Sequence, residues 1–217
     1  MAATKRHSKS DGTVVRASVK VAVAVVGDTG VGKTCMLLAY LTGRFPSNCP
    51  EGSVDWHSEF DHLTRHPVQV VIGDVEVNIT LVDTVGLDEY QKLRAVVCAS
   101  ADVYLVCFDV TKPATLERVR HHWIPEIREY NSVAPFVLVA TKCDERIAAQ
   151  IEGRSSRDTV SFSQARSAGQ ELGAITYCEC SARNLTGLKK IFEEAAAAGL
   201  KKAYPDGMDK KNGCVLA

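Results

Sequence analysis

The segment from Gly27 to Thr34 has glycine, lysine and threonine at the spacing of a phosphate-binding loop. It reads Gly-Asp-Thr-Gly-Val-Gly-Lys-Thr and matches the pattern GxxxxGK[ST]. Glycines let backbone amides turn toward phosphate oxygens, and the N-terminus of a following helix adds the positive end of its dipole. We expect Lys33 to reach the β- and γ-phosphates of a nucleotide and the Thr34 hydroxyl to bind magnesium. The residues expected to contact the nucleotide here are Asp28, Thr29, Gly30, Val31, Gly32, Lys33, Thr34 and Cys35.

A second candidate is the DxxG sequence Asp83-Thr84-Val85-Gly86, which follows an apolar run. We expect the Asp83 carboxylate to meet the magnesium through water and the Gly86 amide to contact the γ-phosphate. DxxG is a weak pattern alone. It becomes strong beside the phosphate loop, because both loops would lie at the carboxyl ends of neighbouring strands, where such sheets bind ligands.

A third set of residues has the chemistry to select guanine. In Thr141-Lys142-Cys143-Asp144, the Asp144 carboxylate offers two acceptors for the N1 and exocyclic amine hydrogens of guanine, a donor pair that adenine lacks. The aliphatic stem of Lys142 is expected to cover the base. Ser181-Ala182 would give a backbone amide to the guanine oxygen. Each sequence is common on its own, and together, in this order after strands, they predict guanine recognition.

Alternating strands and helices position these loops. Apolar runs at 19–26, 68–72, 75–82, 103–108, 136–140 and 175–178 predict six strands, and Gly73-Asp74 predicts a tight hairpin turn. Amphipathic stretches at 33–41, 89–98, 114–130, 161–172 and 185–203 predict helices, the fourth started by a capping box from Ser161 to Gln164. The pattern predicts an α/β fold, a mostly parallel six-stranded sheet with helices on both faces.

Composition suits one soluble domain. The chain has 217 residues and a net charge of +0, so it has no general attraction to nucleic acid or to an anionic surface. No run of about 18 apolar residues exists and the polar N-terminus lacks a signal peptide, so we expect a cytosolic protein. Its eight cysteines lack paired CxxC spacing and predict reduced thiols.

From about residue 19 onward, the chain resembles the Rho-type members of the Ras-like small GTPases. The likeness rests on Gly32-Lys33-Thr34-Cys35, Phe45-Pro46, Thr141-Lys142-Cys143-Asp144, Glu179-Cys180-Ser181-Ala182 and Trp123-Ile124-Pro125-Glu126. The resemblance implies a P-loop NTPase fold, a Ras-like G domain at 18–203 with a Rho-type insert at about 145–160. It also implies that Phe45 lies edge-on near the guanine. Residues 1–17 and 204–217 are expected to be a flexible arm and a flexible tail.

The resemblance further implies a molecular switch that holds GTP or GDP with magnesium and hydrolyses GTP to GDP and phosphate. Lys33, Thr34 and Asp83 would organise charge. Magnesium and the γ-phosphate would order two loops, at roughly 44–66 and 84–98, to which effector proteins bind. Exchange factors and a dissociation inhibitor are the other expected partners of a monomer, with no nucleic acid beyond the mononucleotide. An ATP-dependent kinase of the same loop class is disfavoured by Asp144.

Two departures from the family concern hydrolysis. Leu87 follows Gly86, where the family has the glutamine that orients the attacking water, and a leucine side chain forms no hydrogen bond. Thr29 replaces a family glycine and would crowd that glutamine and a partner's arginine. We expect slow hydrolysis and a protein that stays loaded with GTP. One alternative is a binding module without turnover, and another is a pocket that orients water through a different group.

A third departure concerns the segment after Phe45-Pro46, which has no obvious threonine for magnesium and the γ-phosphate. Ser53 and Ser58 are both candidates. Ser58 precedes a stretch, 59–63, that resembles the effector-contact region of the family, whereas Ser53-Val54-Asp55 fits nearly as well.

Cys214-Val215-Leu216-Ala217 has the C-a-a-X form, whose terminal alanine favours farnesylation of Cys214 by a prenyltransferase. A prenyl chain with Lys210 and Lys211 nearby predicts reversible attachment to the cytoplasmic face of the plasma membrane or an endomembrane, alongside a soluble pool.

Overall fold

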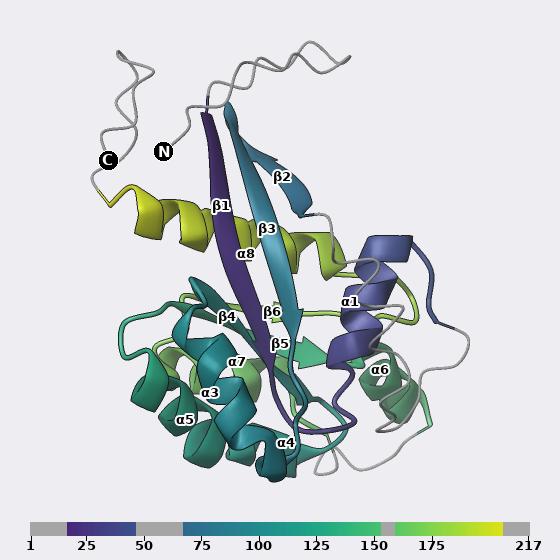
Figure 1. The fold of residues 1–217 in the computed structure, drawn as a ribbon. Helices are drawn as coiled ribbons and strands as arrows, with labels where there is room; N and C mark the ends of the chain where they lie inside the picture. Colours follow the sequence, from purple (N-terminus) through teal and green to yellow (C-terminus); the bar gives the residue numbers. More distant parts are fainter. Residues whose placement is uncertain (1–16, 47–66, 153–158, 206–217) are drawn as a thin grey trace.

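The computed structural model describes residues 17–46, 67–152 and 159–205 and contains the predicted six-stranded sheet (Figure 1). The strands are β1 (Ala17–Val26), β2 (Val68–Ile72), β3 (Val75–Asp83), β4 (Val103–Asp109), β5 (Phe136–Thr141) and β6 (Thr176–Glu179). They are arranged in the order β2-β3-β1-β4-β5-β6, and only β2 runs antiparallel to its neighbour. Every residue of β4 and β5 is buried, as expected for central strands covered on both faces.

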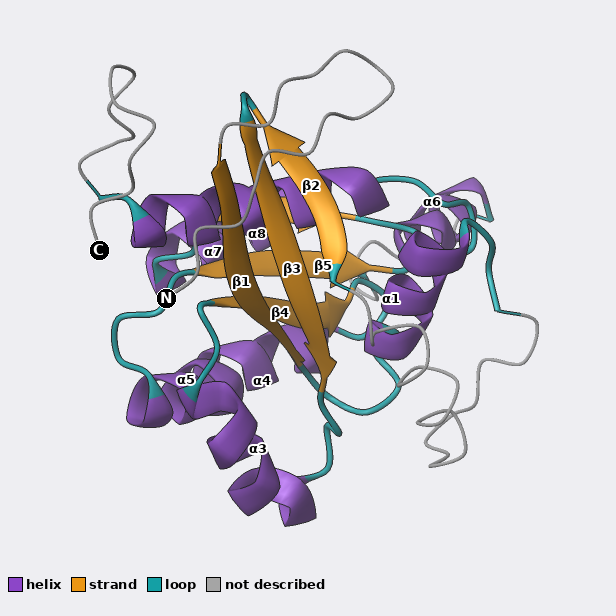
Figure 2. Ribbon diagram, turned by 45° about the horizontal axis from the view of Figure 1, so that its top comes forward, coloured by secondary structure: helices purple, strands orange, loops and turns teal. Residues whose placement is uncertain are grey.

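Helices cover both faces of the sheet, as predicted. The α-helices are α1 (Lys33–Thr42), α3 (Gln91–Ala99), α4 (Pro113–Arg118), α5 (Ile124–Tyr130), α6 (Cys143–Ile151), α7 (Phe162–Leu172) and α8 (Leu188–Ala203). One apolar cluster joins α1 and α8 to the sheet and includes the stacked rings of Tyr40 and Phe192. The other cluster contains residues of α3, α4, α5 and α7. Figure 2 shows α3, α4 and α5 together on one side of the sheet. The two clusters pack against opposite faces of the same sheet.

Local signals in the sequence placed two boundaries correctly. Ile72 pairs with Val75 across the Gly73-Asp74 turn, where Gly73 takes a φ of 60° that favours glycine. The Ser161 hydroxyl accepts a hydrogen bond from the Gln164 amide, and the Gln164 side chain accepts one from the Ser161 amide. Both the hairpin and the capping box are confirmed.

The helix predicted at 114–130 is interrupted by a π-helical segment, Val119–Trp123, between α4 and α5. Pro125 explains the interruption. A proline has no amide to donate to the carbonyl four residues earlier, that of His121, and its ring collides with that carbonyl in a regular α-helix. Widening the preceding turn relieves the collision. The structure also divides the stretch predicted at 89–98 into a short 3₁₀ turn, η2 (Asp88–Tyr90), followed by α3.

The structure changes the bounds of two other expected elements. The expected surface insert after Asp144 begins as a helix, α6, which includes Cys143, whereas residues 153–158 lie outside the described part of the chain. The last helix starts at Leu188, because Leu185 and Gly187 have positive φ angles of 58° and 73°.

Among the described residues, no helix has both the length and the apolar character needed to span a membrane.

The prediction of reduced thiols holds for the five cysteines that the structure describes as free, namely Cys98, Cys107, Cys143, Cys178 and Cys180. It is wrong for Cys35 on α1, which is disulfide-bonded. Spacing along a chain does not show which sulfur atoms meet in space, so the sequence had no signal for this bond.

Candidate functional site

The predicted site segments all follow strands that end at one edge of the sheet. β1 lies between β3 and β4, and β5 lies between β4 and β6, all four pairs being parallel. The loops after β1, β3, β5 and β6 therefore meet at the carboxyl ends of these strands. Open α/β sheets bind ligands in this position.

Backbone geometry explains the glycines of the phosphate loop. Gly27, Gly30 and Gly32 take φ angles of 144°, 79° and 95°, which residues with a side chain rarely adopt. A Cβ on Gly27 would lie 2.4 Å from the Cys107 carbonyl oxygen of β4. The loop thus turns tightly against the sheet before α1 begins at Lys33.

Lys33 lies inside this loop. Its Nζ donates hydrogen bonds to the carbonyls of Gly27 (2.7 Å) and Asp28 (3.0 Å), and the residue is buried. Burial lowers the pKa of the Lys33 ammonium below its ordinary value, and the nearby Asp83 carboxylate offsets only part of this effect. A phosphate group beside the ammonium would reduce the cost of burying the charge, so the environment of Lys33 suits an anionic ligand.

The two residues predicted to bind magnesium are in direct contact. The Thr34 hydroxyl of α1 donates a hydrogen bond of 2.5 Å to Oδ2 of Asp83, at the end of β3. Next to Asp83, the buried Thr84 hydroxyl donates to the Val25 carbonyl and fixes the DxxG segment against β1. A hydroxyl and a carboxylate are the oxygen ligands that magnesium prefers beside substrate phosphates, so the pair fits this ion.

Gly86 packs directly against the phosphate loop. A Cβ at Gly86 would lie 2.5 Å from both the Gly27 carbonyl oxygen and the Thr29 amide nitrogen. Thr29 and Leu87 are both exposed and flank this contact. The structure therefore brings the two residues expected to slow hydrolysis to the same place.

The segment predicted to bind the base is tied to the phosphate loop by two side chains. The Thr141 hydroxyl donates to the Val31 carbonyl at 2.5 Å. Lys142, with a φ of 58°, directs its Nζ to the Gly30 carbonyl at 2.8 Å and to Oδ2 of the buried Asp109, also at 2.8 Å. The sequence analysis did not include Asp109. This residue ends β4, the one parallel strand whose carboxyl end was not considered.

The structure also brings Phe45 near Asp144. Arg183 connects them, since its Nε lies 3.9 Å from Oδ2 of Asp144 and its guanidinium lies 5.8 Å from the centre of the Phe45 ring. Asp144 is largely buried, whereas Phe45 is exposed. The expected edge-on position of Phe45 near the guanine stays a prediction. Arg183 was not predicted, because only the fold places it between the two residues.

The Ser181-Ala182 loop is held to the Asp144 segment by backbone hydrogen bonds. The Cys180 amide donates to Ala140, and the Cys143 amide donates to Cys180. Ser181 is fully buried, and its amide donates to the Thr186 carbonyl. Of the predicted pair, Ala182 is therefore the residue whose amide suits the guanine oxygen.

An ion pair that the sequence analysis missed reinforces the base loops. Arg146 of α6 donates to both carboxylate oxygens of Glu179, at 2.8 and 2.6 Å, and the Tyr177 hydroxyl donates to the same carboxylate. Burial raises the pKa of Glu179, but the hydrogen bonds from Arg146 and Tyr177 outweigh it, so the net shift is downward. The pair links the helix after Asp144 to the strand before Ser181.

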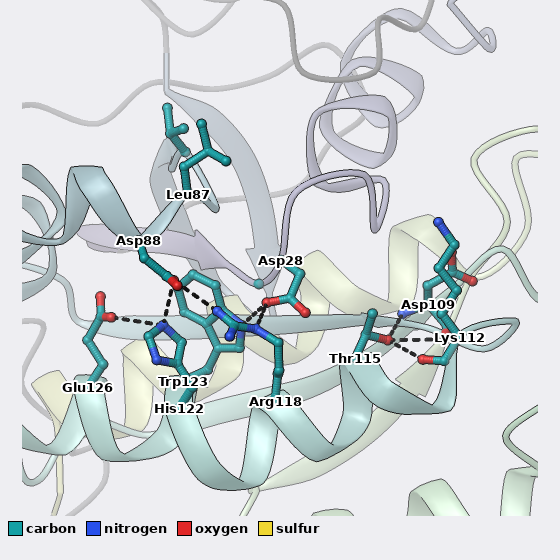
Figure 3. A network of polar contacts seen from close by, with 12 residues as sticks. Asp28, Leu87, Asp88, Asp109, Lys112, Thr115, Arg118, His122, Trp123 and Glu126 are labelled. Carbon is teal, nitrogen blue, oxygen red and sulfur yellow. Dashed lines mark hydrogen bonds and ion pairs between the residues drawn. The ribbon is translucent and has the colours of Figure 1, made fainter.

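A polar network connects the phosphate loop to the helical run from α4 to α5 (Figure 3). The Asp28 carboxylate accepts hydrogen bonds from Arg118 and from the Trp123 indole. The buried Arg94 of α3 donates to the carbonyls of Val85 and Leu87 and forms a bidentate pair with Glu126. In Figure 3 the Leu87 side chain points away from this network.

Three predicted residues lie outside the described part of the chain, namely Ser53, Ser58 and Cys214. The choice between Ser53 and Ser58 for magnesium and the lipidation of Cys214 thus stay predictions. Cys35 is half-buried on α1, immediately after Thr34.

Comparison with known families gives a match in agreement with this geometry. The model described as the Ras family matches residues 22–201, well over half of the chain and every strand-end loop of the site. The arrangement of the sheet, the phosphate loop and the base loops is that of a P-loop NTPase G domain.

Proposed function

Because the chain belongs to the Ras family of small GTPases, we propose that it is a Rho-type switch that binds GTP or GDP with magnesium and hydrolyses GTP slowly. The observation that carries this proposal is the position of Lys142. Its Nζ reaches the Gly30 carbonyl, which links the segment from Thr141 to Asp144 to the phosphate loop, as a shared nucleotide site requires. A site with Lys33 and loop amides for an anion and the Asp144 carboxylate to match guanine suits a guanine nucleotide.

In the proposed site each part of the nucleotide has a matched group. Lys33 and the loop amides bind the phosphates, and Asp144 accepts the hydrogen bonds that distinguish guanine from adenine. Thr34 and Asp83 would hold magnesium, which when bound neutralises charge on the β- and γ-phosphates. The Gly86 amide would contact the γ-phosphate, so that the segment after it takes different positions in the GTP and GDP states.

Slow hydrolysis follows from Leu87 and Thr29. The attacking water needs a hydrogen-bonding group to orient it, and an oriented water with a partner's arginine accelerates hydrolysis by roughly 10³- to 10⁵-fold. Leu87 provides no such group. Thr29 lies where Gly86 packs tightly against the phosphate loop, so its side chain would crowd the space needed by a water-orienting group and by a partner's arginine. The level of the GTP form would then depend on exchange, expression or membrane attachment.

The expected partners follow from the same proposal. Effectors would bind the surface formed by residues of roughly 44–66 and 84–98, and exchange factors and a dissociation inhibitor would act on the monomer. Farnesylation of Cys214 would attach the protein reversibly to a cytoplasmic membrane face. Mass spectrometry of the native protein would test the lipid, since an unmodified Cys214 thiol throughout would contradict it.

Nucleotide analysis of the purified chain tests the central proposal. We expect one bound guanine nucleotide, GTP or GDP, per protein chain. In single-turnover assays we expect GTP to be hydrolysed slowly, with little stimulation by an activating protein. Absence of guanine nucleotides would contradict the switch. The second candidate, a module that binds GTP without turnover, is favoured by Leu87 and would show no GDP formation at all.

A further inference from the structure

Asp28, in the phosphate loop, is bound through both its backbone carbonyl and its side-chain carboxylate. Its carbonyl accepts the hydrogen bond from Lys33, at 3.0 Å. Its carboxylate accepts hydrogen bonds from Nε of Arg118, at 2.6 Å, and from Nε1 of Trp123, at 2.8 Å (Figure 3). The Asp28 side chain is only 15% exposed, so these contacts are shielded from water. The position of Asp28, and with it one carbonyl that Lys33 binds, depends on the helical run from α4 to α5.

The Arg118 guanidinium also binds the segment after Gly86. Its second nitrogen, Nη2, lies 2.9 Å from Oδ1 of Asp88, the residue that follows Leu87 and starts η2. A planar guanidinium with nitrogens in a fixed fork can contact two carboxylates at once, which an ammonium group does poorly. One side chain therefore bridges the phosphate loop and the segment that follows β3.

The segment after Gly86 is held to the same helices at further points. His122 lies with Nε2 3.4 Å from both Asp88 and Glu126. Glu126 in turn pairs with Arg94, which binds the Val85 and Leu87 carbonyls. Four side chains of the helical run thus contact the phosphate loop or the segment after Gly86, directly or through Arg94: Arg118, His122, Trp123 and Glu126.

We propose that Arg118 is a positioning residue that couples the phosphate loop to the segment after Gly86 and thereby slows nucleotide release. This inference rests on the proposed binding of guanine nucleotides. Release requires the phosphate loop to loosen its hold on the phosphates, and Arg118 ties that loop to a second segment and to a helix. Loss of the bridge removes the direct link between Asp28 and Asp88 and leaves each carboxylate held by a single weaker set of contacts, Asp28 to Trp123 and Asp88 to His122, so the barrier to release falls.

The two arms of Arg118 contribute unequally. Its side chain is 41% exposed and that of Asp88 is 67% exposed, so water screens this arm and weakens it. The arm to Asp28 is better shielded. We therefore expect the Asp28 contact to supply most of the effect and Asp88→Asn to reproduce only a small part of it.

The test measures release of a fluorescent GDP from the full chain with magnesium bound, in matched arginine variants. Arg118→Gln should release GDP about 3- to 10-fold faster, the loss expected for a partly screened, charge-assisted hydrogen bond. Arg120→Gln is the control. It removes the same charge two residues away, where Arg120 forms ion pairs with Glu171 at 2.6 Å and Glu117 at 3.6 Å, neither of them a predicted nucleotide-site residue. Arg118→Lys, which keeps the charge without the fork, should restore part of the slow release.

Trp123 provides a readout that a general loss of stability would not give. The chain has two tryptophans, so Trp56→Phe leaves Trp123 as the only one. Its indole hydrogen bond to Asp28 should change when Arg118 is replaced, and its emission should shift in Arg118→Gln but not in Arg120→Gln. Melting temperatures of the two variants without nucleotide should be similar.

Equal release rates in Arg118→Gln and Arg120→Gln, with wild-type protein binding GDP, would overturn the role of Arg118 and leave the switch intact. Faster release in Arg118→Gln would also overturn it if this variant melted at a clearly lower temperature than Arg120→Gln and its Trp123 emission were unchanged. The faster release would then reflect a general loss of stability. Failure of the wild-type chain to bind GDP would overturn the proposed function and this inference together.

Discussion

Leu87 and Thr29 are the two side chains to which the proposed slow GTP turnover is assigned. Gly86 packs against the Thr29 backbone, which puts residue 87 next to the phosphate loop. Leu87 is 44% exposed and cannot bind a water molecule by a hydrogen bond. The chain thus has the residues proposed to bind a nucleotide, but at position 87 it has no hydrogen-bonding side chain to orient the attacking water that the proposal requires.

Restoring that side chain should restore turnover. We expect Leu87→Gln combined with Thr29→Gly to raise single-turnover GTP hydrolysis by about 10-fold or more, since one well-placed hydrogen-bonding group in an active site contributes about 10²-fold. Leu87→Met with Thr29→Gly is the control, because methionine has a similar size and orients water poorly. Equal rates in the two double variants would show that another group already positions the water.

Glu179 gives a residue-level prediction about pH. Its folded pKa is lowered, so the ion pair with Arg146 stabilises the fold above the unfolded pKa near 4.5 and is lost as the pH falls through the folded value. Glu179→Gln should lower the free energy of unfolding at neutral pH by about 1 kcal/mol and make it depend less on pH below about 4.5. Denaturant unfolding at several pH values measures both effects.

Glu193→Gln is the matched control for this experiment. Glu193 pairs with Lys189 at 3.5 Å on the surface of α8, where both side chains are largely exposed. Such pairs contribute little to stability. The prediction fails if the two variants show the same dependence on pH.

At the scale of elements, the contact between the β1 and β3 loops limits residue 86 to glycine. A Cβ there would meet backbone atoms, which cannot rotate away as a side chain can. Gly86→Ala should therefore hold the segment after β3 away from the phosphate loop. We expect the variant to fold and to bind GDP, but to lose most of its preference between GDP and a GTP analogue. Calorimetry with both ligands decides the point, and an unchanged preference would refute the role given to Gly86.

The packing of α8 on β1 makes a second prediction at this scale. A Cβ on Gly199 would lie 2.4 Å from Cγ1 of Val21, a short and stiff side chain. Gly199→Ala should lower the free energy of unfolding by about 1–3 kcal/mol through overpacking. Gly169→Ala in α7 is the control, because its Cβ would meet nothing closer than 3.4 Å and alanine favours a helix. A neutral Gly199→Ala would mean that α8 can shift on the sheet.

The elements themselves were largely predictable from residues that lie close together in the sequence. Buried strands such as β4 read as uninterrupted apolar runs, and the Ser161 cap depends on a residue three positions away. The π segment was not predicted, although Pro125 explains it once the structure is seen. Periodicity shows where apolar residues recur but does not show how a helix adjusts around a proline.

For the whole molecule, the order of the motifs predicted which loops lie at the same edge of the sheet, since parallel strands end at one edge. The cross-links between those loops were not predictable. Arg118 and Trp123 are 90 and 95 residues from Asp28, and no local pattern reports such distances. Arg183 between Asp144 and Phe45 is a similar case. The fold brings these residues together, and the sequence shows only that they are polar or aromatic.

The molecule as a whole acts as a switch only if its strand-end loops form one site for a guanine nucleotide. Calorimetry of the nucleotide-free full chain with magnesium tests this most directly, by comparing GDP with ADP in wild type and in Asp144→Asn. We expect 1:1 binding of GDP, weaker binding of ADP by about 10³-fold or more, and loss of most of that preference in Asp144→Asn, because an unmatched buried polar group is costly. ADP binding as tight as GDP binding, or a preference unchanged in Asp144→Asn, would contradict the account.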